Sequence, residues 1–419
     1  MGDGRAVRYA VFDIEVTQPI AALPLSPADA GVAVLIRRKG VPVGFWMQPT
    51  TGSSNVSAAE VAQRISGEAG QKIVAEAIRE EMADPTVPSP LPVVSVAICT
   101  KDRSDCIERL LHSLRSQADG LPSGSGGFEI LVVDNAPSND KTREVAARWP
   151  EVRYLVEPRP GLNFARNLAL REARGDILAF LDDDVVVDRH WAAGLASAWS
   201  QHQDAAAFTG QVLPLELETE AQVLFEFRAG FRRGFDRVRY GAVLPGDRLY
   251  PGGAGLFGTG ANMAFRIDIV RQLGGFDEAL DTGAPLPGGG DLDMFYRIIR
   301  SGHVLVYEPR FLVFHQHRRE MKALRFQYRR SWGFGFMCYV SKCIQTDPER
   351  RVNLRRLVVW WFAKGLIDSI KHLRKKLRGQ RHVPPSILVG EVFGGVVGFL
   401  GGYARSQRRI AGIRQRFGV

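Results

Sequence analysis

Short apolar runs alternate with segments of helical spacing through the middle of the chain. The runs are rich in β-branched residues, as buried strands are. They predict strands at residues 93–99, 128–133, 152–156 and 177–181, with helices between them at residues 106–116, 141–149 and 163–173. This alternation predicts an α/β fold with a mostly parallel, Rossmann-like sheet and right-handed crossovers. In such sheets ligands bind beyond the carboxyl ends of the strands.

The first 90 residues have a different pattern and predict a small α+β module. Residues 9–16 alternate like a strand, and residues 32–36 and 41–46 form a hairpin pattern with Gly40 in its turn. A helix is expected from Ser57, its N-cap, to Met82. A proline-rich linker then leads to the main domain, residues 91–335. The module carries no recognisable chemistry, and a structural or docking role is the preferred interpretation.

The net charge of +10 is concentrated at the C-terminal end. Residues 351–419 hold 15 Lys and Arg against 2 Asp and Glu, so the first 350 residues carry about −3. An aromatic run at 357–362 precedes the most basic stretch, and glycines recur every fourth residue from Gly390 to Gly402. These features predict a helical region, residues 336–419, that packs closely through its small face and contacts an anionic membrane surface. Nucleic-acid binding is the alternative, but no recognition motif accompanies the charge.

The rest of the composition adds two expectations. The apolar segment 387–403 is marginal as a membrane span because Glu391 interrupts it. The four cysteines show no zinc spacing, which favours reduced thiols.

Three consecutive aspartates, Asp182–Asp184, follow the predicted strand 177–181. Side chains alternate along a strand, so Asp182 and Asp184 should point the same way. Two such carboxylates repel each other unless a cation lies between them. Oxygen ligands suit Mg²⁺ or Mn²⁺, ions that commonly carry substrate phosphates. The triplet therefore predicts a metal–diphosphate site, with a solvated acidic turn as the alternative.

Other polar residues fall at the same predicted edge of the sheet. Thr100, Asp102 and Arg103 follow the first strand, and Asp134 ends the second. Asp134 suits contact with a nucleotide base or ribose, and an Asx turn is its ordinary alternative. Arg166, on the helix after Gly161, would reach an anionic phosphate unless it lies on a solvated face.

Later segments supply further candidates. The glycine-rich stretch 252–262, which ends in Asn262, permits close backbone approach and fits a loop shaped around a sugar. Asp291 opens a helix behind three glycines and is the candidate general base, with a plain N-cap as the alternative. Asp293 is expected to support the loop.

A pair of histidines, His315 and His317, follows a predicted strand. At this spacing both side chains point the same way, and one would complete the metal site with a neutral imidazole nitrogen. Each histidine taken alone is more typical of a hydrogen-bonding loop residue.

Seven segments in this order resemble the family 2 glycosyltransferases, which have a GT-A fold. They span roughly residues 93–330 and comprise 96–103, 132–135, 161–167, 180–184, 258–263, 274–277 and 289–291. The resemblance implies inverting transfer from a nucleotide-sugar with a divalent cation, Mn²⁺ or Mg²⁺. It implies a DxD motif at Asp182–Asp184 with Asp184 as the direct metal ligand, and His315 or His317 as a further ligand. The expected nucleotide-sugar contacts are Thr100, Asp102, Arg103, Asp134, Arg166, Asp182, Asp183 and Asn262.

The same resemblance implies that Asp291 is the catalytic base. Gly290 replaces the Glu of the family's Glu-Asp pair, which puts the acceptor contacts of that Glu in doubt. Residues 327–332 are one residue off the motif of processive members and are not taken as a match.

These observations together predict a glycosyltransferase of cell-surface polysaccharide or glycolipid assembly. Its acceptor would be a saccharide or a lipid-linked sugar, and it would attach peripherally to the cytoplasmic side of the membrane. A positioned base such as Asp291 contributes ~10²–10⁴-fold to proton removal. The alternatives are a non-catalytic nucleotide- or sugar-binding scaffold and a sugar nucleotidyltransferase, which would consume a nucleoside triphosphate and a sugar phosphate.

Overall fold

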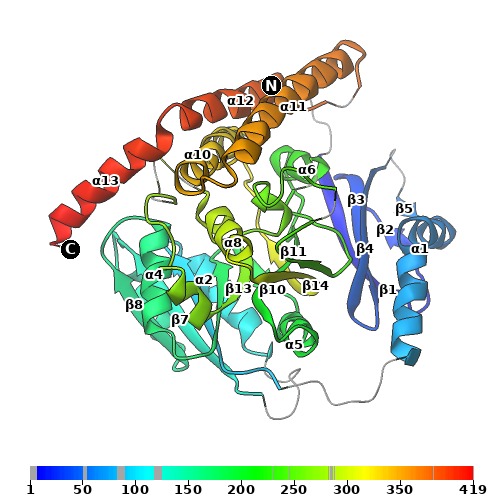
Figure 1. Ribbon diagram of the computed structural model, residues 1–419. Coiled ribbons are helices and arrows are strands. Elements are labelled where there is room, and N and C mark those ends of the chain that lie inside the picture. Colours follow the sequence, from blue (N-terminus) through cyan, green and yellow to red (C-terminus); the bar gives the residue numbers. More distant parts are fainter. Residues whose placement is uncertain are drawn as a thin grey trace.

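The computed structural model describes most of the chain. The described residues are 7–50, 54–82, 90–117, 125–228, 230–244, 246–281, 283, 286, 288–380 and 382–418. A large mixed sheet forms the centre, a small sheet with one long helix packs beside it, and the last helices lie across one edge (Figure 1).

The central sheet has nine strands, eight of them in the order β10-β14-β11-β13-β9-β6-β7-β8, with β12 paired to β14. Strands β9, β6, β7 and β8 are mutually parallel, whereas β13 runs antiparallel between β9 and β11. The predicted α/β class is confirmed, with antiparallel strands in one half. The strands are β6 (Val94–Thr100), β7 (Phe128–Asn135), β8 (Val152–Glu157), β9 (Ile177–Asp182), β10 (Val185–Val187), β11 (Ala205–Pro214), β12 (Val238–Tyr240), β13 (Asn262–Arg266) and β14 (Val304–His315).

Helices cover both faces of this sheet because alternate side chains of each strand are apolar on both sides. Ile98 and Val132 contact one layer, and Ala97 and Val133 contact the other. The first layer contains α2 (Ser104–Leu114), α3 (Lys141–Ala146) and α5 (Trp191–Gln201), and the second contains α4 (Leu162–Glu172) and α8 (Gly290–Arg300). Short elements complete the domain: α6 (Glu220–Phe227), η2 (Ala254–Leu256), α7 (Ile267–Gln272), α9 (Met321–Gln327) and the π-helix η3 (Tyr328–Gly335).

The N-terminal residues form a sheet of their own. Its order is β1-β3-β4, from β1 (Arg8–Glu15), β3 (Asp29–Arg38) and β4 (Val41–Pro49), and α1 (Ala58–Met82) packs on it. The backbone N–H of Glu60 donates to the Ser57 hydroxyl, as the predicted cap requires. A second small pair joins β2 (Leu23–Pro24) and β5 (Asn55–Val56).

A buried ion pair ties this sheet to the main domain. Nη2 of Arg37 lies 2.6 Å from Oδ2 of Asp188, and the Tyr9 amide donates to the Leu217 carbonyl. The N-terminal module therefore packs on the main domain through specific polar contacts as well as apolar ones.

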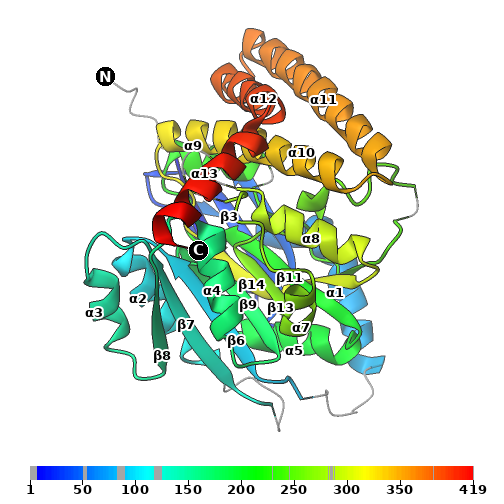
Figure 2. The ribbon, with the colours of Figure 1, turned by 60° about the vertical axis from the view of Figure 1, so that its left-hand side comes forward.

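Four helices end the chain: α10 (Phe336–Thr346), α11 (Arg351–Leu377), α12 (Pro385–Phe399) and α13 (Gly402–Phe417). Figure 2 shows α11 and α12 side by side above α10, with α13 descending toward α4. Within the described part of the chain no single helix is long and apolar enough to cross a membrane; α12 and α13, bent by 64°, pass that test only as a pair.

Candidate active site

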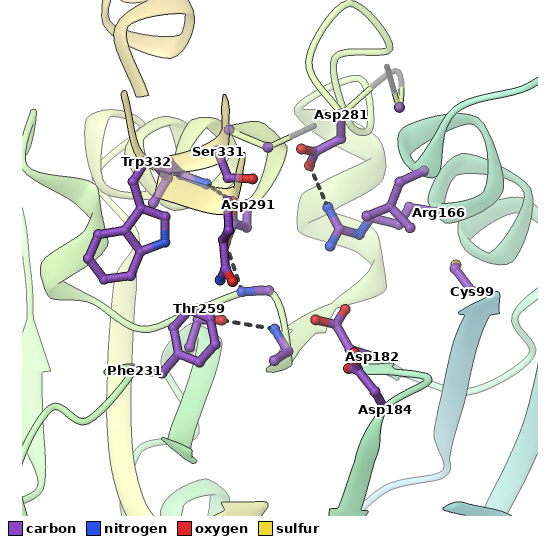
Figure 3. Close-up of a pocket in the computed structure, with 18 of the residues that line it drawn as sticks. Cys99, Arg166, Asp182, Asp184, Phe231, Thr259, Asp281, Asp291, Ser331 and Trp332 are labelled. Atoms are coloured by element: carbon purple, nitrogen blue, oxygen red, sulfur yellow. Dashed lines mark hydrogen bonds and ion pairs between the residues drawn. The ribbon is translucent and has the colours of Figure 1, made fainter. Parts of the chain in front are cut away.

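One pocket of about 930 Å³ opens at the carboxyl ends of β6, β7 and β9. Its volume suits a substrate the size of a nucleotide-sugar. Thr100, Asn135 and Asp182 reach it from these three strands. Figure 3 shows Asp182 facing Thr259 of the glycine-rich loop and Asp291 of α8. The expected convergence of strand ends on one crevice is therefore what the structure shows.

Asp182, Asp184 and His315 form a group suited to a metal ion. One potential ligand atom of each lies within 4.8 Å of the others. Nε2 of His315 is 3.2 Å from Oδ1 of Asp184, because β14 ends beside β10, which follows the aspartates. Two carboxylates and one imidazole are ligands that Mn²⁺ accepts readily.

His317 is not a member of this group, so His315 is the one of the two histidines that lies beside the aspartates. It is buried behind His315, with the Nδ1 atoms of the two rings 3.1 Å apart and its Nε2 2.8 Å from Oε1 of Glu226. Burial lowers the pKa of His317, which keeps its ring neutral. One arrangement satisfies both contacts: His315 Nδ1–H donates to His317, and His317 Nε2–H donates to Glu226. In this arrangement the lone pair of His315 Nε2 would point at a cation held between the two aspartates. Without a cation, burial opposes protonation of His315, but the nearby Asp184 carboxylate outweighs that effect and raises the pKa of the ring.

The three aspartates have different electrostatic environments. Burial raises the pKa of Asp183 to about 7, against the opposing effect of Arg103. Burial acts on Asp184 in the same direction, but His315 and Arg103 together hold its pKa well below the usual range. Asp183 also accepts a hydrogen bond of 2.7 Å from the Thr100 hydroxyl. All three aspartates line the pocket, and the middle one also anchors the loop to β6.

Asp291 lies across the pocket from the aspartate triplet (Figure 3). Its Oδ2 accepts a 2.8 Å hydrogen bond from the Gly260 amide. A Cβ atom at residue 260 would lie 2.8 Å from Nη2 of Arg166 and 3.2 Å from Oδ2 of Asp291, so the loop requires glycine there. This contact fixes the orientation of the Asp291 carboxylate in the pocket.

Arg166 is buried beneath the pocket and pairs with Asp281 at 3.0 Å. Asp281 has a φ of +55° and also accepts from the Gly290 amide at 3.0 Å. Burial raises the pKa of Asp281 to about 6, with the nearby Arg166 acting in the opposite direction. Arg166 thus places a positive charge at the base of the pocket, and Asp281 holds it there. The sequence pattern did not predict this role for Asp281.

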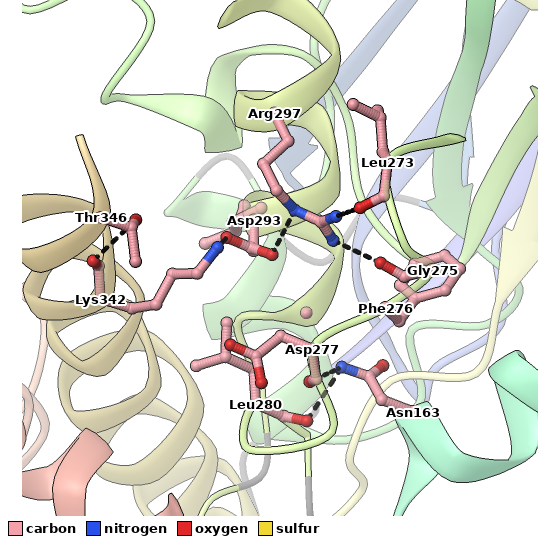
Figure 4. Close-up of polar contacts among 12 residues, drawn as sticks. Asn163, Leu273, Gly275, Phe276, Asp277, Leu280, Asp293, Arg297, Lys342 and Thr346 are labelled. Carbon is pink, nitrogen blue, oxygen red and sulfur yellow. Dashed lines mark hydrogen bonds and ion pairs between the residues drawn. The ribbon is translucent and has the colours of Figure 1, made fainter. Parts of the chain in front are cut away.

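Asp293 has the supporting role expected of it. It is fully buried, accepts from Nε of Arg297 at 2.8 Å and pairs with Lys342 of α10 (Figure 4). Arg297 in turn donates to the carbonyls of Leu273 and Gly275. This network fixes the start of α8, and with it the position of Asp291.

Three other predicted contact residues lie outside the pocket lining. Asp102 accepts from the Ser138 amide at 2.9 Å and holds a loop on the surface. Asn262 is fully buried, accepting from the Trp191 indole and donating to the Phe311 carbonyl, so its role is structural rather than ligand-binding. Asp134 is buried beside the Tyr154 hydroxyl, 2.9 Å away, and its neighbour Asn135 reaches the pocket surface instead. The structure therefore places Asp102, Asp134 and Asn262 outside the pocket lining, away from the contacts predicted for them.

The structure adds pocket residues from segments that the sequence interpretation set aside. Gln327, Ser331 and Trp332, passed over as an imperfect motif, all line the pocket. So do Trp361, Glu391 and Arg409, which lie in α11, α12 and α13 respectively. The region after residue 335 therefore contributes to the pocket wall.

Comparison with known proteins agrees with this geometry. Residues 95–271 match the family model for glycosyl transferase family 2. This segment is a family 2 glycosyltransferase domain. The match covers the strands that carry Thr100, Asp134 and the aspartate triplet, and it supports the GT-A fold predicted from the motif order.

The glycosyltransferase domain has several curated relatives. The pre-mycofactocin glycosyltransferase of Mycobacterium tuberculosis is 26% identical over 266 residues, which is 60% of this chain and 51% of that protein. Glycosyltransferase AglE of Haloferax volcanii is 25% identical, over 68% of this chain and 84% of that one. The chain thus spans about half the length of the first relative. A solved mannosyltransferase of Pyrobaculum calidifontis, in complex with GDP-Man and Mn²⁺, has 19% identity, 81% coverage of both chains and a TM-score of 0.40.

Proposed function

We propose that the protein is a metal-dependent, inverting glycosyltransferase that moves a sugar from a nucleoside-diphosphate-sugar to an acceptor hydroxyl. The observation that carries the proposal is one pocket with two opposed parts. Asp182, Asp184 and His315 form a cation site on one side, and Asp291 presents a fixed carboxylate on the other. The family 2 match over residues 95–271 supports the same chemistry.

The metal ligands and Arg166 act on the leaving group, and Asp291 acts on the nucleophile. A divalent ion, Mn²⁺ or Mg²⁺, held by Asp182, Asp184 and His315 would stabilise negative charge on the departing diphosphate. Arg166 adds a fixed positive charge at the floor of the pocket. Asp291 accepts the proton of the acceptor hydroxyl as that oxygen attacks the anomeric carbon. A single displacement of this kind inverts the anomeric centre without a covalent enzyme intermediate.

Metal-ligand variants test this proposal. The protein would be screened with nucleotide-sugars and Mn²⁺ for thermal stabilisation, and the best donors would then be assayed for nucleoside diphosphate release. Asp184→Ala and His315→Ala should abolish metal-dependent donor binding and turnover, because each removes a ligand. Asp268→Ala, in an exposed ion pair with Arg266, is the matched control.

The same assay separates the alternatives. Turnover that survives excess chelator would contradict the metal-dependent mechanism. Consumption of a nucleoside triphosphate with a sugar phosphate would identify a nucleotidyltransferase, and binding without any turnover would identify a scaffold.

We also propose peripheral attachment to an anionic membrane, on its cytoplasmic side. Two exposed stripes of apolar side chains support it, and we call them the C-terminal stripes. The stripe on α11 comprises Val352, Val359, Leu366, Ile370, Leu373 and Leu377, and the stripe on α12 comprises Val389, Phe393, Val396 and Leu400. Their spacing of three, four or seven residues places each set on one helix face. The net charge of +13 around them favours anionic lipid.

A lipid-linked or cell-surface saccharide acceptor fits this arrangement. Trp361, Glu391 and Arg409 reach the pocket from the same helices that carry, or adjoin, the C-terminal stripes. A substrate anchored in the membrane would therefore approach the pocket from this side. The names of two relatives support an acceptor of this class: a succinoglycan biosynthesis protein of Rhizobium meliloti and a glucosyl-dolichyl phosphate glucuronosyltransferase of Haloferax volcanii.

A further inference from the structure

Arg233 lines the pocket without a carboxylate partner among the described residues. Its Nε donates to the Gly255 carbonyl at 2.6 Å and its Nη1 to the Arg232 carbonyl at 2.9 Å. A guanidinium has five N–H donors, so most of its donor capacity remains for a ligand. The neighbouring arginines differ: Arg232 pairs with Glu226, and Arg237 pairs with Glu308.

Hydrogen bonds to two buried side chains, Gln211 and Tyr307, hold the backbone around Arg233 in place. The Arg233 amide donates to Oε1 of Gln211 at 3.2 Å, and Nε2 of Gln211 donates to the Gly234 carbonyl at 3.1 Å. The Tyr307 hydroxyl donates to the same carbonyl at 2.7 Å. Gln211 and Tyr307 are fully buried. The guanidinium is therefore positioned before any ligand arrives, as a binding group should be.

Arg233 belongs to the Asp291 side of the pocket: its Nε donates to the Gly255 carbonyl, and a Cβ atom at Gly255 would lie 4.0 Å from Cδ2 of Leu292, the residue after Asp291. Burial lowers the pKa of Arg233, because the guanidinium loses water, and Tyr307, Tyr240 and Asp291 act in the opposite direction. The diphosphate belongs at the other side, with the aspartate triplet and Arg103, where two ion pairs already join Arg103 to Asp183 and Asp184. A part-buried cation that makes no ion pair among the described residues loses part of its hydration without direct compensation, so its presence here requires an explanation.

We infer that Arg233 binds an anionic group, a carboxylate or phosphate, on the sugar or acceptor that lies beside Asp291. The planar fork of arginine matches both groups with two parallel hydrogen bonds. The anion has two possible sources: the C6 carboxylate of a uronic-acid donor, or an acidic group on the acceptor. This inference rests on the proposed function and specifies its substrate class.

The test uses ligand pairs that differ only in charge, with binding measured by calorimetry in the presence of Mn²⁺. The donor arm compares UDP-glucuronate with UDP-glucose and GDP-mannuronate with GDP-mannose. The acceptor arm compares glucuronic acid and glucose 6-phosphate with glucose, each in the presence of UDP. The wild-type protein should prefer the anionic member in at least one arm by roughly 10- to 100-fold, the usual worth of hydrogen bonds to a charged group.

Three variants make the result specific. Arg233→Gln should remove the preference, and Arg233→Lys, which keeps the charge but loses the fork, should retain part of it. Arg239→Gln, in a surface ion pair with Asp204, should keep the full preference. Binding of UDP with Mn²⁺ and the melting temperature report whether each variant is folded, and Arg233→Lys decides the question if Arg233→Gln does not fold.

The outcomes separate this inference from the proposed function. No preference in either arm, or a preference that survives in Arg233→Gln, overturns the role of Arg233. Turnover of a neutral donor alongside such a result would leave the glycosyltransferase proposal intact. Absence of turnover with every donor would contradict the glycosyltransferase proposal, while the binding arms would still decide the role of Arg233.

Discussion

At the residue scale, the charge of each pocket carboxylate depends on its partner. Burial raises the pKa of Asp182, and the neighbouring charge of Asp184 adds to that effect. Burial acts on Asp184 in the same direction, but His315 and Arg103 outweigh it and hold the pKa of this carboxyl well below its ordinary value. A divalent ion between Asp182 and Asp184 would favour the ionised form of both, since opposite charge offsets desolvation. Arg103, which is not one of the proposed ligands, therefore helps to set the charge of the ligand set.

Asp291 and Asp293 are two residues apart and should respond differently to the same substitution. Asp291→Asn keeps the size of the side chain but cannot accept the acceptor proton at neutral pH. Turnover should fall by roughly 10²-fold or more, while donor binding, measured by calorimetry, should remain because the diphosphate site is elsewhere. Asp293→Asn should act mainly on stability, because its carboxylate is buried between Arg297 and Lys342. Near-wild-type turnover in Asp291→Asn would show that another group is the base.

The Asp281–Arg166 pair predicts a pH dependence of stability. The folded-state pKa of Asp281 is about 6, above its ordinary value of 3.8. Between these values the folded protein holds a proton that the unfolded chain has lost, so this residue makes stability fall as pH rises through the window. The slope is at most about 1.4 kcal/mol per pH unit for one group.

Asp281→Asn isolates this contribution from that of other carboxyl groups. Denaturant melts give the unfolding free energy of each protein at each pH. The value for the wild type minus the value for the variant should fall between pH 4 and pH 6 and level off above pH 7. A difference that is constant across this range would contradict the raised pKa.

At the element scale, glycines pack α12 against the π-helix η3. A Cβ atom at Gly394 would lie 2.0 Å from the Arg329 carbonyl oxygen, and one at Gly398 would lie 2.4 Å from that of Phe334. At Gly390 the nearest atom is 3.9 Å away. The close approach brings residues 327–332 into the pocket wall, so the predicted small face of this helix packs on protein.

Matched alanine substitutions test this packing. Gly394→Ala should lower the free energy of unfolding by about 1–3 kcal/mol, the usual cost of overpacking. Gly390→Ala, one turn earlier, should leave stability unchanged or raise it by up to about 1 kcal/mol, because alanine favours the helix. Denaturant melts of the two variants check the contrast, and equal effects would contradict the close contact.

Sequence patterns predicted the parallel strands and the aspartate triplet because both depend on local signals. An apolar run identifies a buried strand wherever it occurs, and the triplet is contiguous. Asp281 had no such signal, since its role depends on Arg166, which lies 115 residues away. Residues 327–332 were missed because a π-helix has a wider turn than the 3.6-residue period, so the facing side chains follow a different spacing.

At the scale of the whole molecule, the terminal helices join a surface to the pocket. Leu354, Leu357 and Ile387 are buried in the core, so α11 and α12 are integral to the fold. Their other faces expose the C-terminal stripes, and Trp361 and Arg409 reach the pocket from the same region. Truncation at residue 350 would remove core and pocket residues together. Substitution of exposed residues is therefore the cleaner test of membrane attachment.

Replacing Leu366, Ile370 and Leu377 with serine removes three members of the α11 stripe without disturbing buried contacts. The wild-type protein should sediment with vesicles that contain phosphatidylglycerol and bind phosphatidylcholine vesicles less, because the surrounding charge is basic. High salt should weaken this binding by screening the charge. The triple variant should bind weakly while keeping its melting temperature.

Val74→Ser with Ile78→Ser, at exposed positions on α1, is the control and should bind like wild type. If the wild-type chain ignores anionic vesicles at low salt, or if the triple variant binds as well as the control, the C-terminal stripes are not a membrane-binding surface.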